Sequence, residues 1–266
     1  MTKLTKNDIQ PLVSIITPLY NAAPFIAQTI ASIQAQTYQN WEQIIVDDCS
    51  TDNSVDIVRA LAALDDRIKL ITLSRNSGAA HTRNIATEAA QGKFIAFLDS
   101  DDLWHAEKLQ KQIAFMQKTA CDVSYTSYVH IDEHGKPLGK RIVALPELHY
   151  KKQHSNNYVG NLTGIYNATS IGKISAPDVR KRQDWALWLD AIKKSGKPAL
   201  GLQEDLAFYR VREGSMSSNK LNLVKYNYQF YKTCLGYSHV VAAICLLRFF
   251  WEYFVVRPEW IQRYDV

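Results

Sequence analysis

The chain has 266 residues, 47% of them hydrophobic and 21% charged, which is enough to bury the core of one or two domains. This composition excludes a disordered or collagen-like chain. The 31 basic and 26 acidic residues leave a net charge of +5, too small and too dispersed to indicate nucleic-acid binding. The four cysteines are far apart and form no CxxC pair, so we expect reduced thiols in a cytoplasmic protein, without a zinc site or a disulfide framework.

The hydrophobic segments predict neither an export signal nor a spanning helix. The apolar run that begins at Leu12 ends at Thr17 and Pro18, and is shorter than the core of a signal peptide. The longest apolar stretch, residues 240–247, is followed by Arg248 and Glu252, which interrupt a span of about 20 residues. A helix that lies on a membrane surface remains compatible with this pattern.

Short β-branched runs alternate with helical patterns from residue 13 to about residue 115, which predicts parallel βαβ units. We expect strands at 13–17, 42–47, 68–73 and 94–99. Helices fit between them: one carrying Ile26, Ile30 and Ile33, one beginning near residues 50–52, and one between Gly78 and Gly92. The strands are continuously apolar and therefore predict a sheet with helices on both faces, which binds ligands beyond its carboxyl edge.

After residue 115 the pattern becomes mixed. Residues 123–131 alternate like an antiparallel strand, and a second arm is expected at 140–144. Residues 146–160 are polar and aromatic and are predicted to form a loop, followed by a strand at 162–166. Apolar residues at helical spacing predict a helix over 183–196 that closes at Gly196.

An acidic cluster follows the fourth predicted strand: Asp99, Ser100, Asp101 and Asp102. Alternate positions at a strand end direct two carboxylates toward one divalent cation, and hard cations prefer oxygen ligands. A helix-capping turn explains the same residues equally simply. An EF-hand is excluded, because Trp104 and Gln110 stand where that loop needs Gly and Glu.

A second acidic pair, Asp47 and Asp48, ends the strand at 42–47. A carboxylate there accepts hydrogen bonds from a base or a ribose hydroxyl, or caps the next helix. The chain has neither a GxGxxG nor a GxxxxGK[ST] motif, which argues against dinucleotide and P-loop sites.

Three further segments carry charged candidates. Arg75, Asn76, Gly78 and Arg83 surround a helix start suited to phosphate oxygens, or are surface residues. Asp184 begins an aromatic helix and is either a general base or an N-cap. Arg210, Arg212 and Ser215 belong to a segment that could close over anionic groups.

Together these motifs resemble bacterial family 2 glycosyltransferases of the GT-A fold, in particular those of teichuronic acid, O-antigen and capsule assembly. The resemblance covers residues 12–217, and its motifs are VSIITPLYN, IIVDDCSTDNS, NSGAAHTRN, FLDSDD, KRQDW and YRVREGSMS. It implies an α/β, Rossmann-like catalytic domain at 12–218, with a nucleotide-sugar-binding half at 12–103 and an acceptor-binding half at 104–218. Residues 1–11 then form an N-terminal tail.

The resemblance also implies roles for individual residues. Pro18, Tyr20 and Asp48 would contact the uracil of a UDP-sugar, Asp99 the ribose, and Asp101 a Mn²⁺ or Mg²⁺ ion on the diphosphate. Arg83 would bind the donor diphosphate, and Asp184 would be the catalytic base of an inverting transfer. Arg212 stands where several relatives have a metal-binding histidine, and as an arginine it would pair with phosphate instead. The other implied donor-binding residues are Leu19, Asn76, Gly78 and Ser100.

The C-terminal segment 219–266 is rich in aromatic residues: 12 of the 29 lie in the 46 residues from 221 onward, with five basic and three acidic residues. Aromatic and basic side chains suit the headgroup region of an anionic membrane. We therefore expect a peripheral enzyme at the inner face of the plasma membrane with a lipid-diphosphate-linked saccharide acceptor. A helical hairpin packed on the catalytic domain, or a dimer interface, is the alternative.

Two other functions use the same residues. A metal-dependent phosphohydrolase also needs clustered aspartates, but not the pair Tyr20 and Asp48. A non-catalytic nucleotide-sugar-binding or scaffolding subunit would keep Asp48 and Asp101 but would not need Asp184.

Overall fold

The computed structural model describes residues 10–179, 181–212 and 220–266. Its centre is the predicted set of four parallel strands, β1 (Val13–Leu19), β2 (Trp41–Asp47), β3 (Ile68–Thr72) and β4 (Phe94–Phe97). They lie in the order β4-β1-β2-β3, so their carboxyl ends meet at one edge. Crossover helices α1 (Ile26–Gln34), α2 (Ser54–Ala62) and α3 (Ala79–Ala89) confirm the βαβ pattern.

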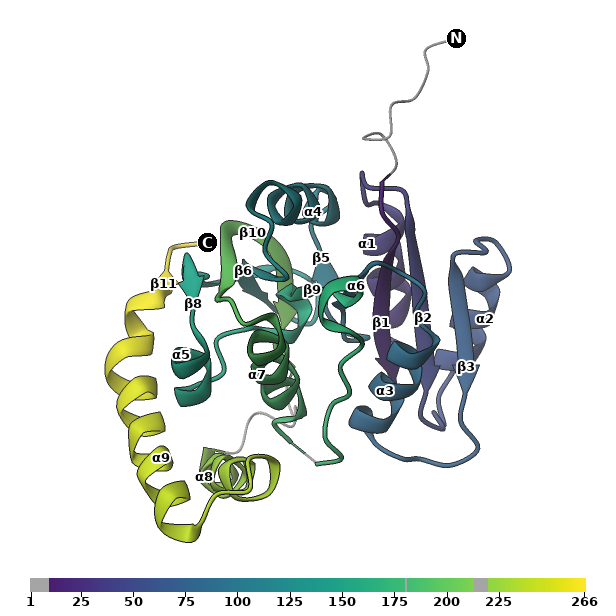
Figure 1. Cartoon of the computed structure of the whole chain (residues 1–266). Coiled ribbons are helices and arrows are strands. Elements are labelled where there is room, and N and C mark those ends of the chain that lie inside the picture. Colours follow the sequence, from purple (N-terminus) through teal and green to yellow (C-terminus); the bar gives the residue numbers. More distant parts are fainter. Residues whose placement is uncertain (1–9, 180, 213–219) are drawn as a thin grey trace.

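Helices cover both faces of this sheet (Figure 1). Because side chains alternate along a strand, Ile15 packs in the core cluster of α1 and α2, and Ile16 in that of α3. The first cluster also contains α4 (Lys108–Thr119), and the second contains α7 (Gln183–Ser195). Helix α7 ends at Gly196, whose φ of +66° suits glycine, as the sequence predicted.

The second half of the chain extends the same sheet. Strand β9 (Ile165–Asn167) pairs antiparallel with β4 and with β6 (Val123–Ile131), which continues to β7 (Pro137–Ile142) and β11 (Ile261–Arg263). A long strand, β10 (Ala199–Arg210), lies parallel to β6 and also pairs with β5 (Leu103–Trp104) and β8 (Glu147–Leu148). Both halves therefore form one mixed sheet.

Three predictions for this half were wrong in detail. The expected loop at 146–160 contains β8 and helix α5 (Tyr150–Ser155), whose buried residues Gln153 and Ser155 are polar and give no apolar signal. The expected strand at 162–166 begins as a 3₁₀ turn (Asn161–Thr163) before β9, and helix α6 (Ala168–Ile171) follows. Strand β10 was missed, because register shifts near Asp205 interrupt its alternation.

The C-terminal segment forms helix α8 (Lys220–Gln229), a π-helical turn (Phe230–Cys234) and helix α9 (His239–Trp251), which continues through Glu252–Val256 and Arg257–Trp260. Phe230 stacks on Trp185 of α7 with ring centroids 4.0 Å apart. Figure 1 shows α9 running along the edge of the molecule beside α5. The segment therefore packs on α5 and α7, as the helical-hairpin alternative predicts.

The C-terminal helical run is longer than the apolar stretch that the sequence shows. Residues 239–260 form one run of 22 residues, of which an 18-residue stretch has a mean hydropathy of 1.7, so that by length and composition alone the run could cross a membrane. Glu252 lies within the run, and its carboxylate is buried against Tyr158 and Lys152. These contacts attach the run to the rest of the molecule.

Candidate active site

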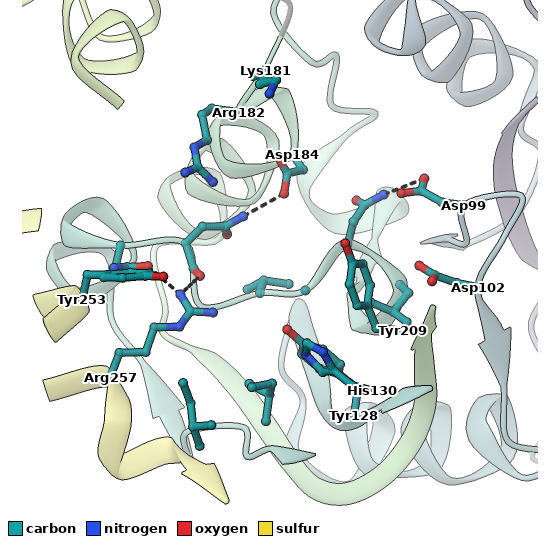
Figure 2. Close-up of a pocket in the computed structure, with 18 of the residues that line it drawn as sticks. Asp99, Asp102, Tyr128, His130, Lys181, Arg182, Asp184, Tyr209, Tyr253 and Arg257 are labelled. Atoms are coloured by element: carbon teal, nitrogen blue, oxygen red, sulfur yellow. Dashed lines mark hydrogen bonds between the residues drawn. The ribbon is translucent and has the colours of Figure 1, made fainter. Parts of the chain in front are cut away.

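A cavity of about 710 Å³ lies between the carboxyl edge of the sheet, the start of α7 and the C-terminal segment. Figure 2 shows Asp99 and Asp102 on one side, Tyr253 and Arg257 on the opposite side, and Asp184 between them. Asp99 and Asp102 after β4 therefore share one cavity with Asp184 on α7, whereas Asp101 does not line it.

Arg83 of α3 connects the acidic strand end to α7. Its Nη2 lies 2.6 Å from Asp99 Oδ1, and Nη1 donates to the side-chain oxygen of Gln183 at 2.8 Å. Burial opposes the charged guanidinium, but Asp99, followed by Asp184 and Asp101, outweighs it and raises the pKa of Arg83. The buried Arg83 cation thus connects Asp99 at the end of β4 to the start of α7.

Asp101 and Asp102 diverge from each other. Asp101 pairs with Arg212 at 2.6 Å, whereas Asp102 accepts a hydrogen bond from the backbone N–H of Arg210 at 2.8 Å. Burial raises the pKa of both carboxyls, most strongly that of Asp102, and Asp99 adds to the effect. Ser100 contributes its backbone oxygen to Thr29. Ser215 lies outside the described residues.

The oxygen ligands that this strand end offers suit a hard divalent cation. Asp99 and Asp101 supply carboxylate oxygens, and the described residues contain no cluster of three or more His, Cys, Asp or Glu side chains arranged around a metal position. Such sparse coordination is typical of Mg²⁺ sites in which one or two carboxylates and substrate phosphates share the ion.

The candidate base-binding residues gather at the ends of β1 and β2, outside the lining of this cavity. Both carboxylate oxygens of Asp48 accept backbone N–H bonds, from Ser77 at 2.6 Å and Gly78 at 2.8 Å. Asp48 therefore orders the loop before α3 instead of capping α2. Its own backbone N–H donates to Leu19, and its backbone oxygen accepts from Asn76. Tyr20 beside them is 52% exposed, and Pro18 pairs with Val46 in the sheet.

Asp184 lies in the first turn of α7 and does not cap it. Its Oδ2 accepts from Asn157 Nδ2 at 2.8 Å. The Asn157 amide is itself oriented by buried Gln153, whose Nε2 donates to Asn157 Oδ1 at 2.9 Å. Gln153 in turn accepts from the Tyr158 N–H. Sequence reasoning missed Asn157, because the segment carries no recognisable motif and its role depends on contacts made only in the fold.

Strained backbone adjoins three candidate residues. Asn21 (φ 47°) follows Tyr20, Cys49 (φ 61°) follows Asp48, and Arg182 (φ 70°) precedes Asp184 by two positions. Side chains other than glycine adopt this region at an energetic cost, and such residues cluster at functional sites. Arg182 is held there by a bond from its Nε to Asn227 Oδ1 of α8, 2.7 Å long. The C-terminal segment thus supports the start of α7.

Arg257 is a second residue that the sequence did not indicate. It lines the cavity from the C-terminal segment, donates to Asn156 Oδ1 at 2.5 Å and donates to the backbone oxygen of Asn157. The C-terminal segment is therefore a wall of the cavity and contacts the residue that orients Asp184.

Residues 14–176 match the model of the family described as "Glycosyl transferase family 2". The chain belongs to this family. The match contains the strand ends that carry Asp48 and Asp99, and it stops before α7, so it does not itself test Asp184.

Curated relatives extend the similarity to most of the chain. TuaG of Bacillus subtilis, named as a teichuronic acid biosynthesis glycosyltransferase, is 42% identical over 240 residues, covering 90% of this chain and 95% of TuaG. WfgD of Escherichia coli is 41% identical over 214 residues, covering 80% of this chain and 83% of WfgD. Its name is UDP-Glc:alpha-D-GlcNAc-diphosphoundecaprenol beta-1,3-glucosyltransferase. The protein is accordingly a glycosyltransferase.

Solved structures confirm the GT-A fold. Residues 1–349 of TarS from S. aureus in complex with UDP-GlcNAc superpose with a TM-score of 0.70 at 22% identity, covering 94% of this chain and 74% of that chain. The mannosyltransferase PcManGT from Pyrobaculum calidifontis, in complex with GDP-Man and Mn²⁺, gives 0.68 at 17% identity, with 95% and 72% covered.

Because Asn157 donates to Asp184, a change at Asn157 should affect turnover without affecting donor binding. Asn157→Leu removes the N–H that orients Asp184, so we expect kcat to fall by about tenfold or more, the scale of one charge-assisted hydrogen bond. The KM for the donor should stay unchanged, and Asn157→Gln should restore part of kcat. Steady-state kinetics measure this. Equal losses in kcat and in donor affinity would contradict an orienting role.

The lowered pKa of His130 makes the stability of the folded protein depend on pH. Burial, together with nearby Lys140, lowers the pKa of His130 to about 4, whereas an unfolded histidine has a pKa of about 6.5. Between these values the unfolded chain binds more protons, so this residue's contribution to stability is present above pH ~6.5 and is lost as the pH falls toward ~4.

The variant His130→Phe keeps a ring beside Tyr128, on which His130 stacks at 5.7 Å. Denaturant unfolding at several pH values should show the variant gaining stability relative to wild type below pH ~6.5 and differing by a constant amount above pH ~7. A constant difference over the whole range would show that folding does not lower the pKa of His130.

Proposed function

We propose that the protein transfers a sugar, with inversion, from a UDP-sugar to a lipid-diphosphate-linked saccharide at the cytoplasmic face of a membrane. The observation that carries this proposal is the shared cavity, in which Asp99 of the acidic strand end and Asp184 of α7 face one space. In the folded chain, residues 12–103 hold the donor and residues 104–218 hold the acceptor. Residues 219–266 associate with the membrane.

The donor binds along the carboxyl edge of the parallel strands. Its uracil lies against Pro18, Tyr20 and Asp48, and Asp48 has unused lone pairs beyond the two N–H bonds it accepts. Leu19, which is buried, supports this site through its backbone oxygen, which accepts from the Asp48 N–H. Asn76 and Gly78 shape the loop beside it. Asp99 and the Ser100 backbone lie at the ribose, and Arg83 and Arg212 provide positive charge for the diphosphate.

Asp101 would hold Mn²⁺ or Mg²⁺. When bound, this ion neutralises charge on the diphosphate leaving group, which is worth several kcal/mol. Arg212 now pairs with Asp101 at 2.6 Å. A cation on Asp101 would free this guanidinium to pair with a phosphate oxygen.

Asp184 acts as the general base. It accepts the proton of the acceptor hydroxyl while that oxygen attacks the anomeric carbon, and the bond from that carbon to the diphosphate oxygen breaks with the electron pair leaving on the nucleoside diphosphate. General-base assistance contributes about 10²- to 10⁴-fold. Asn157 holds the second carboxylate oxygen and so fixes the direction of the first.

The identity of donor and acceptor is supported by relatives. The name of WfgD specifies UDP-Glc and a GlcNAc-diphosphoundecaprenol acceptor, and WfaP of Escherichia coli, 39% identical over 209 residues, carries the same description. A glucosyl or related hexosyl donor and a polyprenyl-diphosphate acceptor are accordingly the first candidates for this chain.

The Asp184→Asn variant tests the proposed reaction. With UDP-glucose, Mn²⁺ and a GlcNAc-diphosphate-lipid acceptor, it should bind UDP-glucose as wild type does and lose about 10²- to 10⁴-fold in transfer rate. The matched control Asp190→Asn changes a carboxylate further along α7 that pairs with Lys194 at the surface, and should remain active.

The outcomes separate the alternatives. Full activity in Asp184→Asn would refute the base assignment. Rapid hydrolysis of the UDP-sugar without any acceptor would favour a phosphohydrolase. Donor binding without transfer to any tested acceptor would favour a non-catalytic subunit.

Membrane association has its own test. The outward face of the run from α9 to residue 254 exposes Val240, Ile244, Leu247, Trp251 and Phe254, each at least 60% exposed. Leu247→Ser with Trp251→Ser should reduce flotation with phosphatidylglycerol vesicles several-fold, because apolar area no longer enters the headgroup region. Leu64→Ser, at an 85% exposed site in the other half of the molecule, is the control. Unchanged flotation of the double variant would show that this surface does not bind the membrane.

A further inference from the structure

One end of the cavity is lined by basic side chains. Lys140 comes from β7, Lys181 and Arg182 precede α7, and Arg257 belongs to the C-terminal segment. The ion pairs formed within residues 10–179, 181–212 and 220–266 include none of Lys140, Arg182 and Arg257. Arg182 and Arg257 donate instead to neutral oxygens, of Asn227, Asn156 and the Asn157 backbone.

These cations lie close enough to repel one another. Burial first, and then the charge of Arg257, lower the pKa of both Lys140 and Arg182. Asp184 is the nearest compensating carboxylate for Arg182, and it is bound to Asn157. Partly buried positive charges without carboxylate partners are costly, and an anion bound between them would remove that cost.

An exposed apolar stripe leads into the same end of the cavity. Val240, Ile244, Leu247, Trp251 and Phe254 are separated by 4, 3, 4 and 3 residues, so they lie along one face of the helical run, with exposures of 69, 60, 69, 63 and 68%. Phe254 also lines the cavity, together with Tyr253 and Arg257. Figure 2 shows Tyr253 and Arg257 across the cavity from Asp99.

The features that line the cavity are those that a lipid-linked sugar needs. Asp184, Lys140, Arg182 and Arg257 share its lining, and the apolar stripe reaches it at Phe254. Of the proposed partners of the donor's diphosphate, Asp101 and Arg212 lie outside the lining of this cavity, and Arg83, which lines it, is already paired with Asp99. An amphiphile with a hydroxyl, a diphosphate and a hydrocarbon chain matches the base, the cations and the apolar stripe.

We propose that Lys140, Arg182 and Arg257 form a binding site for the diphosphate of the acceptor, with its hydrocarbon chain along the stripe from Val240 to Phe254. This inference rests on the proposed function and adds the residues that recognise the acceptor class. The acceptor sugar then extends toward Asp184, and the diphosphate sets its distance from the base. Acceptors without the diphosphate would bind weakly, whatever their sugar.

Geranyl diphosphate is a soluble probe for this site. Calorimetric titration in the presence of saturating UDP keeps the donor site filled, so binding reports a second diphosphate site. Wild type should bind geranyl diphosphate at least tenfold more tightly than geraniol. Lys140→Gln should weaken that binding about tenfold, the scale of one charge-assisted contact, and should leave UDP affinity unchanged.

Lys136→Gln is the matched control. Lys136 is exposed, lies on the hairpin between β6 and β7 and does not line the cavity. It should bind geranyl diphosphate as wild type does, and melting temperatures of both variants check that they are folded. Lys140 is the primary test position because it forms no contact with Asn157 or Asp184, whereas Arg257 does and would disturb the base.

Several results would overturn the inference. Complete displacement of geranyl diphosphate by UDP would show that the only diphosphate site is the donor's. Equal binding of geranyl diphosphate by Lys140→Gln and wild type would show that the proposed residues do not form the site. Loss of phosphatidylglycerol-vesicle binding in Lys140→Gln, with geranyl diphosphate binding intact, would assign these cations to lipid headgroups.

The donor proposal can fail separately. If UDP binds and geranyl diphosphate does not, the acceptor site is wrong and the nucleotide site stands. If geranyl diphosphate binds in a Lys140-dependent way and UDP does not bind, the acceptor site stands and the proposed donor is wrong.

Discussion

The arrangement of the site depends on the contacts of the buried Arg83 guanidinium. It pairs with Asp99 at the end of β4 and, with the Gln183 amide oxygen turned toward it, donates to Gln183 at the start of α7, so one cation connects the parallel strands to α7. Only 9% of the Arg83 side chain is exposed, compared with 31% for Asp99. Removing one partner of a buried pair leaves an uncompensated charge and costs about 3–5 kcal/mol. The distance between the donor residues and Asp184 is thereby held by charge as well as by packing.

A second set of contacts brings the C-terminal segment into the site. Trp185 stacks on Phe230, Arg182 is bonded to Asn227, and Arg257 contacts Asn157, which in turn orients Asp184. The same segment carries the exposed stripe from Val240 to Phe254. The segment that carries the exposed stripe is therefore also the segment whose side chains hold Asn157 and the start of α7.

The sequence predicted the parallel half of the fold well, because strands buried on both faces and helices such as α1 carry strong periodic signals. It also placed Asp48, Asp99, Asp101 and Asp184 at strand ends or a helix start, where local pattern determines position. It could not place Asn157 or Arg257, whose roles come from contacts between segments about 100 residues apart in the chain. It missed β10 and α5 for a related reason: a register shift hides the alternation of one, and buried polar residues mask the other.

A crystal structure with a bound UDP-sugar tests most directly whether donor and base meet in one cavity. We expect the nucleotide along the ends of β1 and β2, with the sugar entering the cavity and its anomeric carbon facing Asp184. The gap between them should admit an acceptor hydroxyl within about 2.6–3.2 Å of the carboxylate. A sugar bound outside the cavity, or one whose anomeric carbon is turned away from Asp184, would contradict the account.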